Sequence, residues 1–146
     1  MFTYVCGSHV CVCAPPAGVS RQNCHPFTHG KWTFMHNGSI GDYPLVKKRL
    51  EALVSDEYYT CRLGSTDSEL IFALALTFGL LETPVLSICR TLEAILRVIK
   101  DTPAITKPVV LACIALTNGT RVYAFRWSYG KASPSLYFGL PKTSMN

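Results

Sequence analysis

Apolar residues recur at helical spacing in three segments of the chain. Residues 44–54 show this spacing after a proline that suits a first helical turn. Residues 67–80 are apolar nearly all round, which predicts a helix buried on several sides, and Thr66 with Glu69 fits a capping box at its start. A third helix is predicted over residues 86–100 by a stripe of Ile88, Cys89, Leu92, Ile95, Leu96 and Ile99.

Strand patterns lie on both sides of these helices. Residues 3–13 are rich in β-branched residues, aromatics and cysteine, which predicts one strand or two short ones broken at Gly7. Residues 31–36 alternate and predict a strand that ends at His36-Asn37-Gly38, which we interpret as a tight turn. Residues 109–127 predict two strands joined by Asn118-Gly119, a strong hairpin signal, and residues 134–140 predict one more. Residues 56–65 are interpreted as loop or short strand. The order of strands, helices and strands predicts an α+β domain whose helices cover an antiparallel sheet.

The composition fits one globular domain over residues 1–146. The apolar fraction is 49% and the charged fraction 16%, which indicates a large interior or a surface that expects a partner. The net charge of +5 is scattered, and the basic run Lys47 to Arg49 fits a solvated helix face, so we expect no nucleic-acid binding.

The seven cysteines and the apolar segments bear on the compartment. Residues 1–12 lack the basic start and the apolar core of a secretory leader, and the cysteines are irregularly placed, so we expect a cytoplasmic protein with free thiols. The apolar run at residues 70–81 is shorter than the ~20 residues that cross a bilayer, so we expect no membrane span.

The segment at residues 22–43, "QNCHPFTHGKWTFMHNGSIGDY", concentrates the groups that usually mark a site. Three kinds of site are possible here: a metal site, a nucleophile with its base, or a strand that presents amide donors. Metal-ligand residue types are present, but their spacing provides no second close pair, so we expect no metal. The candidate ligands are Cys11, Cys13, Cys24, His25, His29 and His36.

A nucleophile with its base, or a pair of amide donors, would each come from neighbouring residues. Cys24 and His25 are adjacent and would point to opposite faces of a strand, which makes them a poor nucleophile and base. Asn37 and Gly38 can present a carboxamide N–H and a backbone N–H to one point, as an oxyanion hole requires, although an Asn-Gly pair taken alone is more often a plain turn.

Two segments together resemble the class II glutamine amidotransferases, a family of N-terminal-nucleophile hydrolases. These are "NCHPFTHGKWTFMHNGSIGDY" and "RLGSTDSELIFALAL", and the likeness covers nearly the whole chain from His9. It is nearest to the small stand-alone branch that includes the ergothioneine-pathway γ-glutamyl hydrolase. The resemblance implies a four-layer αββα sandwich of antiparallel sheets, which would be incomplete at its edges in this chain.

The resemblance also implies the site residues and the ligand. The oxyanion hole maps onto Asn37 and Gly38, and the carboxylate that binds the α-amino group of glutamine maps onto Asp67. A carboxylate at a helix N-terminus is well held and can pair with an ammonium, although simple capping also explains Asp67. The ligand would be glutamine or a γ-glutamyl compound, with no cofactor.

Two departures from the family bear on activity. Family members begin with Met-Cys and use the freed cysteine as nucleophile, whereas this sequence begins Met-Phe-Thr-Tyr, and Cys6 and Cys11 have no free amine. Cys11 also stands where the family has an arginine that grips the α-carboxylate. We therefore expect a partial domain without the N-terminal nucleophile strand, produced by truncation or misreading of the gene or by decay, and inactive as given.

A second hypothesis treats the chain as a non-catalytic module. It would bind an amino acid at Asp67, or interact with another protein. Sheet edges left unpaired by missing strands would favour self-association.

Overall fold

The computed structural model describes residues 21–133 and 135–137. Its elements, in chain order, are the 3-10 helix η1 (Arg21–Asn23), β1 (Phe27–His29), β2 (Trp32–Ile40), α1 (Tyr43–Glu51), α2 (Asp56–Tyr59), α3 (Asp67–Thr77), α4 (Pro84–Lys100), β3 (Val110–Thr117) and β4 (Val122–Tyr129).

The four strands form one antiparallel sheet in the order β1-β2-β3-β4. Strands β3 and β4 make the hairpin that the Asn118-Gly119 pair predicts, which is confirmed. Gly119 has a φ of +87°, and the side-chain oxygen of Asn118 accepts the backbone N–H groups of Thr120 and Arg121. Gly119 therefore supplies the positive φ, and Asn118 the side-chain acceptor, that make Asn-Gly pairs common in hairpin turns.

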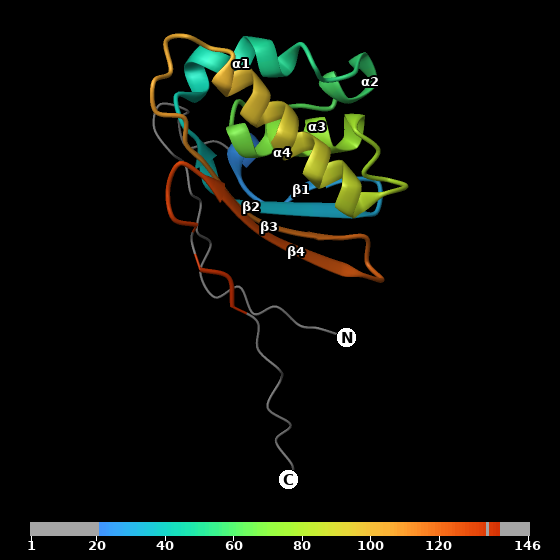
Figure 1. The fold of residues 1–146 in the computed structure, drawn as a ribbon. Helices are drawn as coiled ribbons and strands as arrows, with labels where there is room; N and C mark the ends of the chain where they lie inside the picture. Colours follow the sequence, from blue (N-terminus) through green and yellow to red (C-terminus); the bar gives the residue numbers. More distant parts are fainter. Residues whose placement is uncertain (1–20, 134, 138–146) are drawn as a thin grey trace.

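All four α-helices lie on one side of the sheet, with α3 next to the strands and α4 packed across it (Figure 1). In β2 the side chains that face the helices are buried at Trp32, Phe34, His36 and Ile40, while Met35 and Asn37 are exposed on the other face. Phe34 stacks on Phe72 of α3 with ring centroids 5.0 Å apart. This contact joins the centre of the sheet to the most deeply buried helix.

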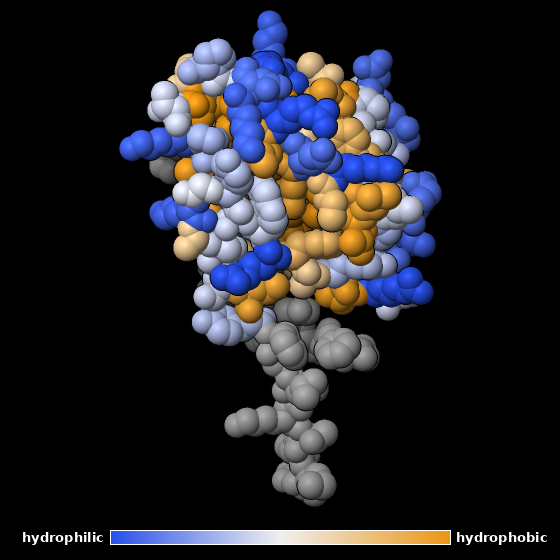
Figure 2. Space-filling model, viewed as in Figure 1, coloured by the Kyte–Doolittle hydropathy of each residue, from blue (hydrophilic) through white to orange (hydrophobic). Residues whose placement is uncertain are grey.

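The helix predictions hold, with changes at the ends. Nine of the eleven residues of α3 are buried, as its apolar sequence predicts, but the helix ends at Thr77. Helix α4 begins at Pro84, and its stripe is buried except that Cys89 is exposed and Leu96 is half-buried. Apolar side chains gather between hydrophilic ones on the face of the molecule shown in Figure 2. Val85 and Leu86 are 54% and 46% exposed, so the first turn of α4 adds apolar surface.

Three predictions about the loops and strands are wrong. Asn37 and Gly38 are not a turn, because β2 continues through them to Ile40 and pairs with β3 along this whole length. Residues 56–59 form the short helix α2 instead of loop or strand, and residues 135–137 are not in a strand. The predicted strand at residues 3–13 lies outside the described residues.

The α+β class with an antiparallel sheet under helices is confirmed. Within residues 21–133 and 135–137 there is one sheet with helices on one face, which corresponds to half of the four-layer sandwich that the resemblance implies.

Candidate functional site

Asp67 joins the start of α3 to the end of β2. Thr66 caps the helix, since its hydroxyl oxygen accepts the backbone N–H of Glu69 at 3.2 Å, and this places Asp67 in the first helical turn. The Oδ2 atom of Asp67 accepts the backbone N–H of Ile40 at 2.9 Å. The carboxylate is half-buried, and it lies at the positive end of the helix dipole, where a negative charge is favoured.

Gly38 lies two residues before Ile40 on the same strand. Gly41 donates its backbone N–H to the carbonyl oxygen of Val109, the residue before β3. Because donors alternate along an antiparallel strand, Gly38 and Ile40 direct their N–H groups to the opposite side of β2, away from β3. The backbone donor of Gly38 and the carboxylate of Asp67 therefore belong to the same edge of β2.

The lack of a side chain at Gly38 is required by its surroundings. A Cβ atom there would overlap the carbonyl oxygen of Leu111 and would lie 2.7 Å from Nε2 of His36. Gly38 does not have a positive φ, so its role is close packing instead of an unusual backbone conformation. This close approach explains why glycine occupies a position inside a strand.

Asn37 has a different environment from the other two predicted site residues. It pairs with Cys113 of β3, which in turn pairs with Arg126 of β4, and its side chain is exposed on the face of the sheet away from the helices. Asp67 and Gly38 thus share one strand edge, while the carboxamide of Asn37 projects from the uncovered face next to Gly38.

His36 lies under this edge and connects β2, β3 and α3. Its Nδ1 atom is 2.9 Å from the hydroxyl oxygen of Ser68, and its Nε2 atom is 3.1 Å from the carbonyl oxygen of Leu111. Burial lowers the pKa of His36 below its ordinary value, while Asp67 and the bond to Leu111 act in the opposite direction. The sequence predicts His36 as a strand residue and names it among the candidate metal ligands, and its alternation with Trp32 and Phe34 is the signal that it faces the core.

His25 is a second histidine close to the site. Burial lowers its pKa, the neighbouring His36 lowers it further, and Asp67 opposes the shift. Within the described part of the chain, the buried Nε2 atom of His25 has no hydrogen-bond partner. His25 therefore lies near both His36 and Asp67 as a neutral imidazole at neutral pH.

Glu69 and Arg62 hold the loop that precedes α3. The carboxylate of Glu69 accepts the backbone N–H groups of Leu63 at 2.7 Å and Gly64 at 3.0 Å. Arg62 donates to Glu51 at 2.9 Å, and its Nε lies 3.9 Å from Glu69. Glu69 thus serves the loop, whereas the capping-box prediction had its side chain return to Thr66, and that half of the prediction is wrong.

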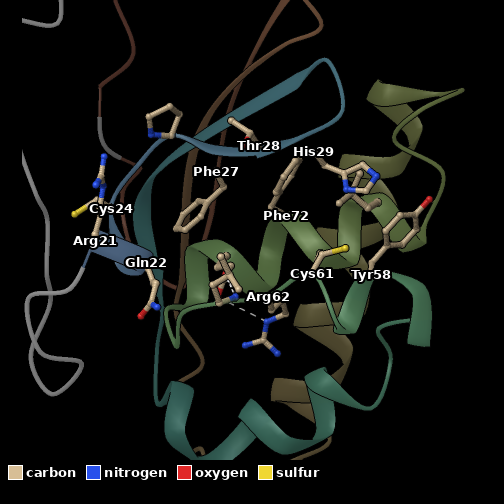
Figure 3. Close-up of a pocket in the computed structure, with 15 residues that line it drawn as sticks. Arg21, Gln22, Cys24, Phe27, Thr28, His29, Tyr58, Cys61, Arg62 and Phe72 are labelled. Carbon is tan, nitrogen blue, oxygen red and sulfur yellow. Dashed lines mark hydrogen bonds and ion pairs between the residues drawn. The ribbon is translucent and has the colours of Figure 1, made fainter.

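A cleft of about 200 Å³ lies between β1, α2 and α3, with Glu69 and Phe72 of α3 on one wall (Figure 3). His29 and Tyr58 meet edge to face at its rim, with ring centroids 5.3 Å apart. Asp67, Asn37 and Gly38 do not line this cleft. The predicted site residues and the cleft are therefore different places on the molecule.

Metal ligands and membrane spans were also part of the sequence predictions. In residues 21–133 and 135–137, no group of three or more His, Cys, Asp or Glu side chains is placed to hold a metal ion. Of the six candidate ligands, Cys11 and Cys13 lie outside this range. Among the helices described, none has the length and apolar character needed to span a membrane.

Comparison with known proteins identifies relatives by sequence and by structure. No protein-family model matches the chain. Over 58 residues, which are 40% of this chain and 16% of the other protein, the sequence is 48% identical to the "Probable glutamine amidotransferase DUG3" of Saccharomyces cerevisiae.

The chain is also similar to a solved structure, that of a glutamine aminotransferase class-II domain protein from Silicibacter pomeroyi. The two structures superpose with a TM-score of 0.68 and 35% sequence identity. The match covers 77% of this chain and 51% of the other, so this chain spans about half the length of that relative.

Proposed function

Because this chain carries a class II glutamine amidotransferase domain, we propose that the edge of β2 beside α3 binds the amino-acid part of glutamine or of a γ-glutamyl compound. Asp67 would pair with the α-ammonium group. The backbone N–H of Gly38 and the carboxamide of Asn37 would stabilise the oxyanion that forms when the γ-carbonyl becomes tetrahedral.

One observation supports this proposal above the others. The carboxylate of Asp67 is fixed by the N–H of Ile40 at 2.9 Å, next to Gly38 on the same edge. An anion held in this way can accept an ammonium through its remaining lone pairs. A carboxylate that acted only as a helix cap would bond to its own helix, and in α3 Thr66 already performs that role.

We also propose a reaction for the intact family member and a branch of the family for this chain. The ancestral chemistry is hydrolysis of a γ-glutamyl amide through a cysteine thioester, and the chain as given is proposed to bind without turnover. Our proposal keeps the stand-alone γ-glutamyl hydrolase branch as the nearest one. It also keeps a single domain over residues 1–146, a cytoplasmic location and self-association through unpaired sheet edges.

Calorimetric titration with L-glutamine tests the binding site. We expect Asp67→Asn to weaken binding by about 2 kcal/mol, or roughly 30-fold in Kd, because the ammonium loses its charged partner. The matched control is Asp56→Asn, which neutralises an exposed aspartate in the first turn of α2. Equal affinity in wild type and Asp67→Asn would refute the assignment of Asp67.

A glutamate-release assay on the same protein separates the two hypotheses of function. Binding without release supports a module that recognises an amino acid. Robust release of glutamate from glutamine or a γ-glutamyl amide would show that the proposed inactivity is wrong.

A further inference from the structure

The carbonyl of Leu111 determines which nitrogen of His36 carries a proton. A carbonyl oxygen only accepts hydrogen bonds, so the Nε2 atom, 3.1 Å away, must be the donor. A neutral imidazole has one N–H group, which leaves Nδ1 as an acceptor. Since Nδ1 is 2.9 Å from the Ser68 hydroxyl, that hydroxyl donates its proton to His36 while the ring is neutral.

Ser68 has a second possible acceptor. Its hydroxyl oxygen lies 3.4 Å from Oδ1 of Asp67, and a hydroxyl has one proton to donate. While His36 is neutral, this proton is used by the imidazole. When His36 gains a proton, Nδ1 becomes a donor to Ser68, and the Ser68 proton is free to turn to Asp67.

We infer that His36 and Ser68 are positioning residues for Asp67, and that they couple its capacity to accept an ammonium to the protonation of His36. The inference rests on the proposed function, because it concerns the same carboxylate. Oδ2 is used by Ile40 in both states, so Oδ1 is the oxygen that changes. When His36 is neutral, Oδ1 of Asp67 is available to a ligand. When His36 is protonated, Oδ1 accepts the hydrogen bond from the Ser68 hydroxyl, and the imidazolium adds a positive charge nearby.

The surroundings of His36 favour its neutral form at neutral pH. Among the described residues, the titratable groups that face the ring are Asp67 from α3 and His25 from the segment before β1. Burial holds the pKa of His36 below its ordinary value, so the neutral, ligand-accepting arrangement prevails at neutral pH. Acidification that protonates His36 would therefore weaken binding of an ammonium.

Nitrogen NMR of the ligand-free wild-type protein tests the first step. We expect His36 to be the Nε2–H tautomer at neutral pH, and the carboxyl carbon of Asp67 to report a second transition when His36 titrates. In Ser68→Ala this second transition should shrink, and in Ser68→Thr, which keeps the hydroxyl, it should return. An Nδ1–H tautomer, or a transition of full size in Ser68→Ala, would overturn the inference.

Titration with L-glutamine across the same pH range tests the coupling. We expect wild-type affinity to fall at least about five-fold as His36 becomes protonated, and the fall to be smaller in Ser68→Ala. Affinity that is independent of pH in the wild type would also overturn the inference. If glutamine does not bind at any pH, the proposed function fails, while the tautomer and the Asp67 transition still decide the hydrogen-bond arrangement.

Discussion

Gly38 is the residue whose substitution should have the clearest structural effect. A Cβ atom there would overlap the carbonyl oxygen of Leu111, which belongs to the rigid backbone of β3. We expect Gly38→Ala to lower the free energy of unfolding by about 1–3 kcal/mol, because β2 and β3 must move apart to admit the methyl group. Urea denaturation followed by circular dichroism measures this change.

Ser39→Ala is the matched control for Gly38→Ala. It places the same side chain at the next position of β2, where the residue is exposed. We expect a change within about 0.5 kcal/mol for this control. Equal stability of the two variants would show that the close approach at Gly38 is not important for the fold.

The two Asn-Gly pairs show what the sequence can predict at this scale. Asn118-Gly119 forms a turn in which Gly119 has a positive φ, as the local pattern predicts. The same pattern at Asn37-Gly38 gives no turn, because pairing with Cys113 and Ala112 of β3 keeps the chain extended. Local preference could not show this, since the residues that decide it lie far away in the sequence, beyond all four helices.

At the scale of elements, Glu69 connects α3 to the loop before it. Its buried carboxylate accepts two backbone N–H groups and faces Arg62, whose side chain is 8% exposed. We expect Glu69→Ala to lower the free energy of unfolding by about 3 kcal/mol, because it leaves the backbone N–H groups of Leu63 and Gly64 without their acceptor and removes one of the two carboxylates beside Arg62. Glu57→Ala in α2 is the control, since Glu57 is exposed, and urea denaturation measures both. A loss equal to that of the control would contradict the buried role.

Elements with a long periodic pattern were predictable, and short ones were not. Helices α3 and α4 follow from apolar spacing, and the β3-β4 hairpin follows from its turn residues. Strand β1 has three residues and α2 has four, which is too few for a periodic signal. Their positions depend on pairing with β2 and on packing against α3, and neither can be deduced from the local sequence.

At the scale of the whole molecule, the sheet has one face under helices and one face that they do not cover (Figure 1). The sequence predicted the α+β class, and it placed Asp67 and the Asn37-Gly38 segment in one site through the family resemblance. The hydrogen bonds of His36 with Ser68 and Leu111 could not be predicted, because they join three elements distant in sequence.

Acid stability is a property of the whole fold, and we expect the buried His36 and the half-buried His25 to control it. The pKa values of His25 and His36 are lowered from 6.5, so the unfolded chain binds protons more readily than the folded one. Their contribution to stability is therefore complete above about pH 6.5 and is lost as the pH falls from there toward their folded pKa values. We expect the melting temperature to decrease between about pH 7.5 and about pH 5.5, and to decrease less in His25→Gln.

His29→Gln is the control for this measurement, because it removes an imidazole from the cleft, which neither His36 nor Asp67 lines. The effect of His25→Gln on the pH dependence should exceed that of this control. A His25→Gln protein with the full wild-type dependence would place the acid sensitivity elsewhere. If only His25→Gln reduces the pH dependence of the melting temperature, protonation of His25 destabilises the fold. Because His25 lies beside His36 and Asp67, the stability of the fold and the protonation of the site would then be linked.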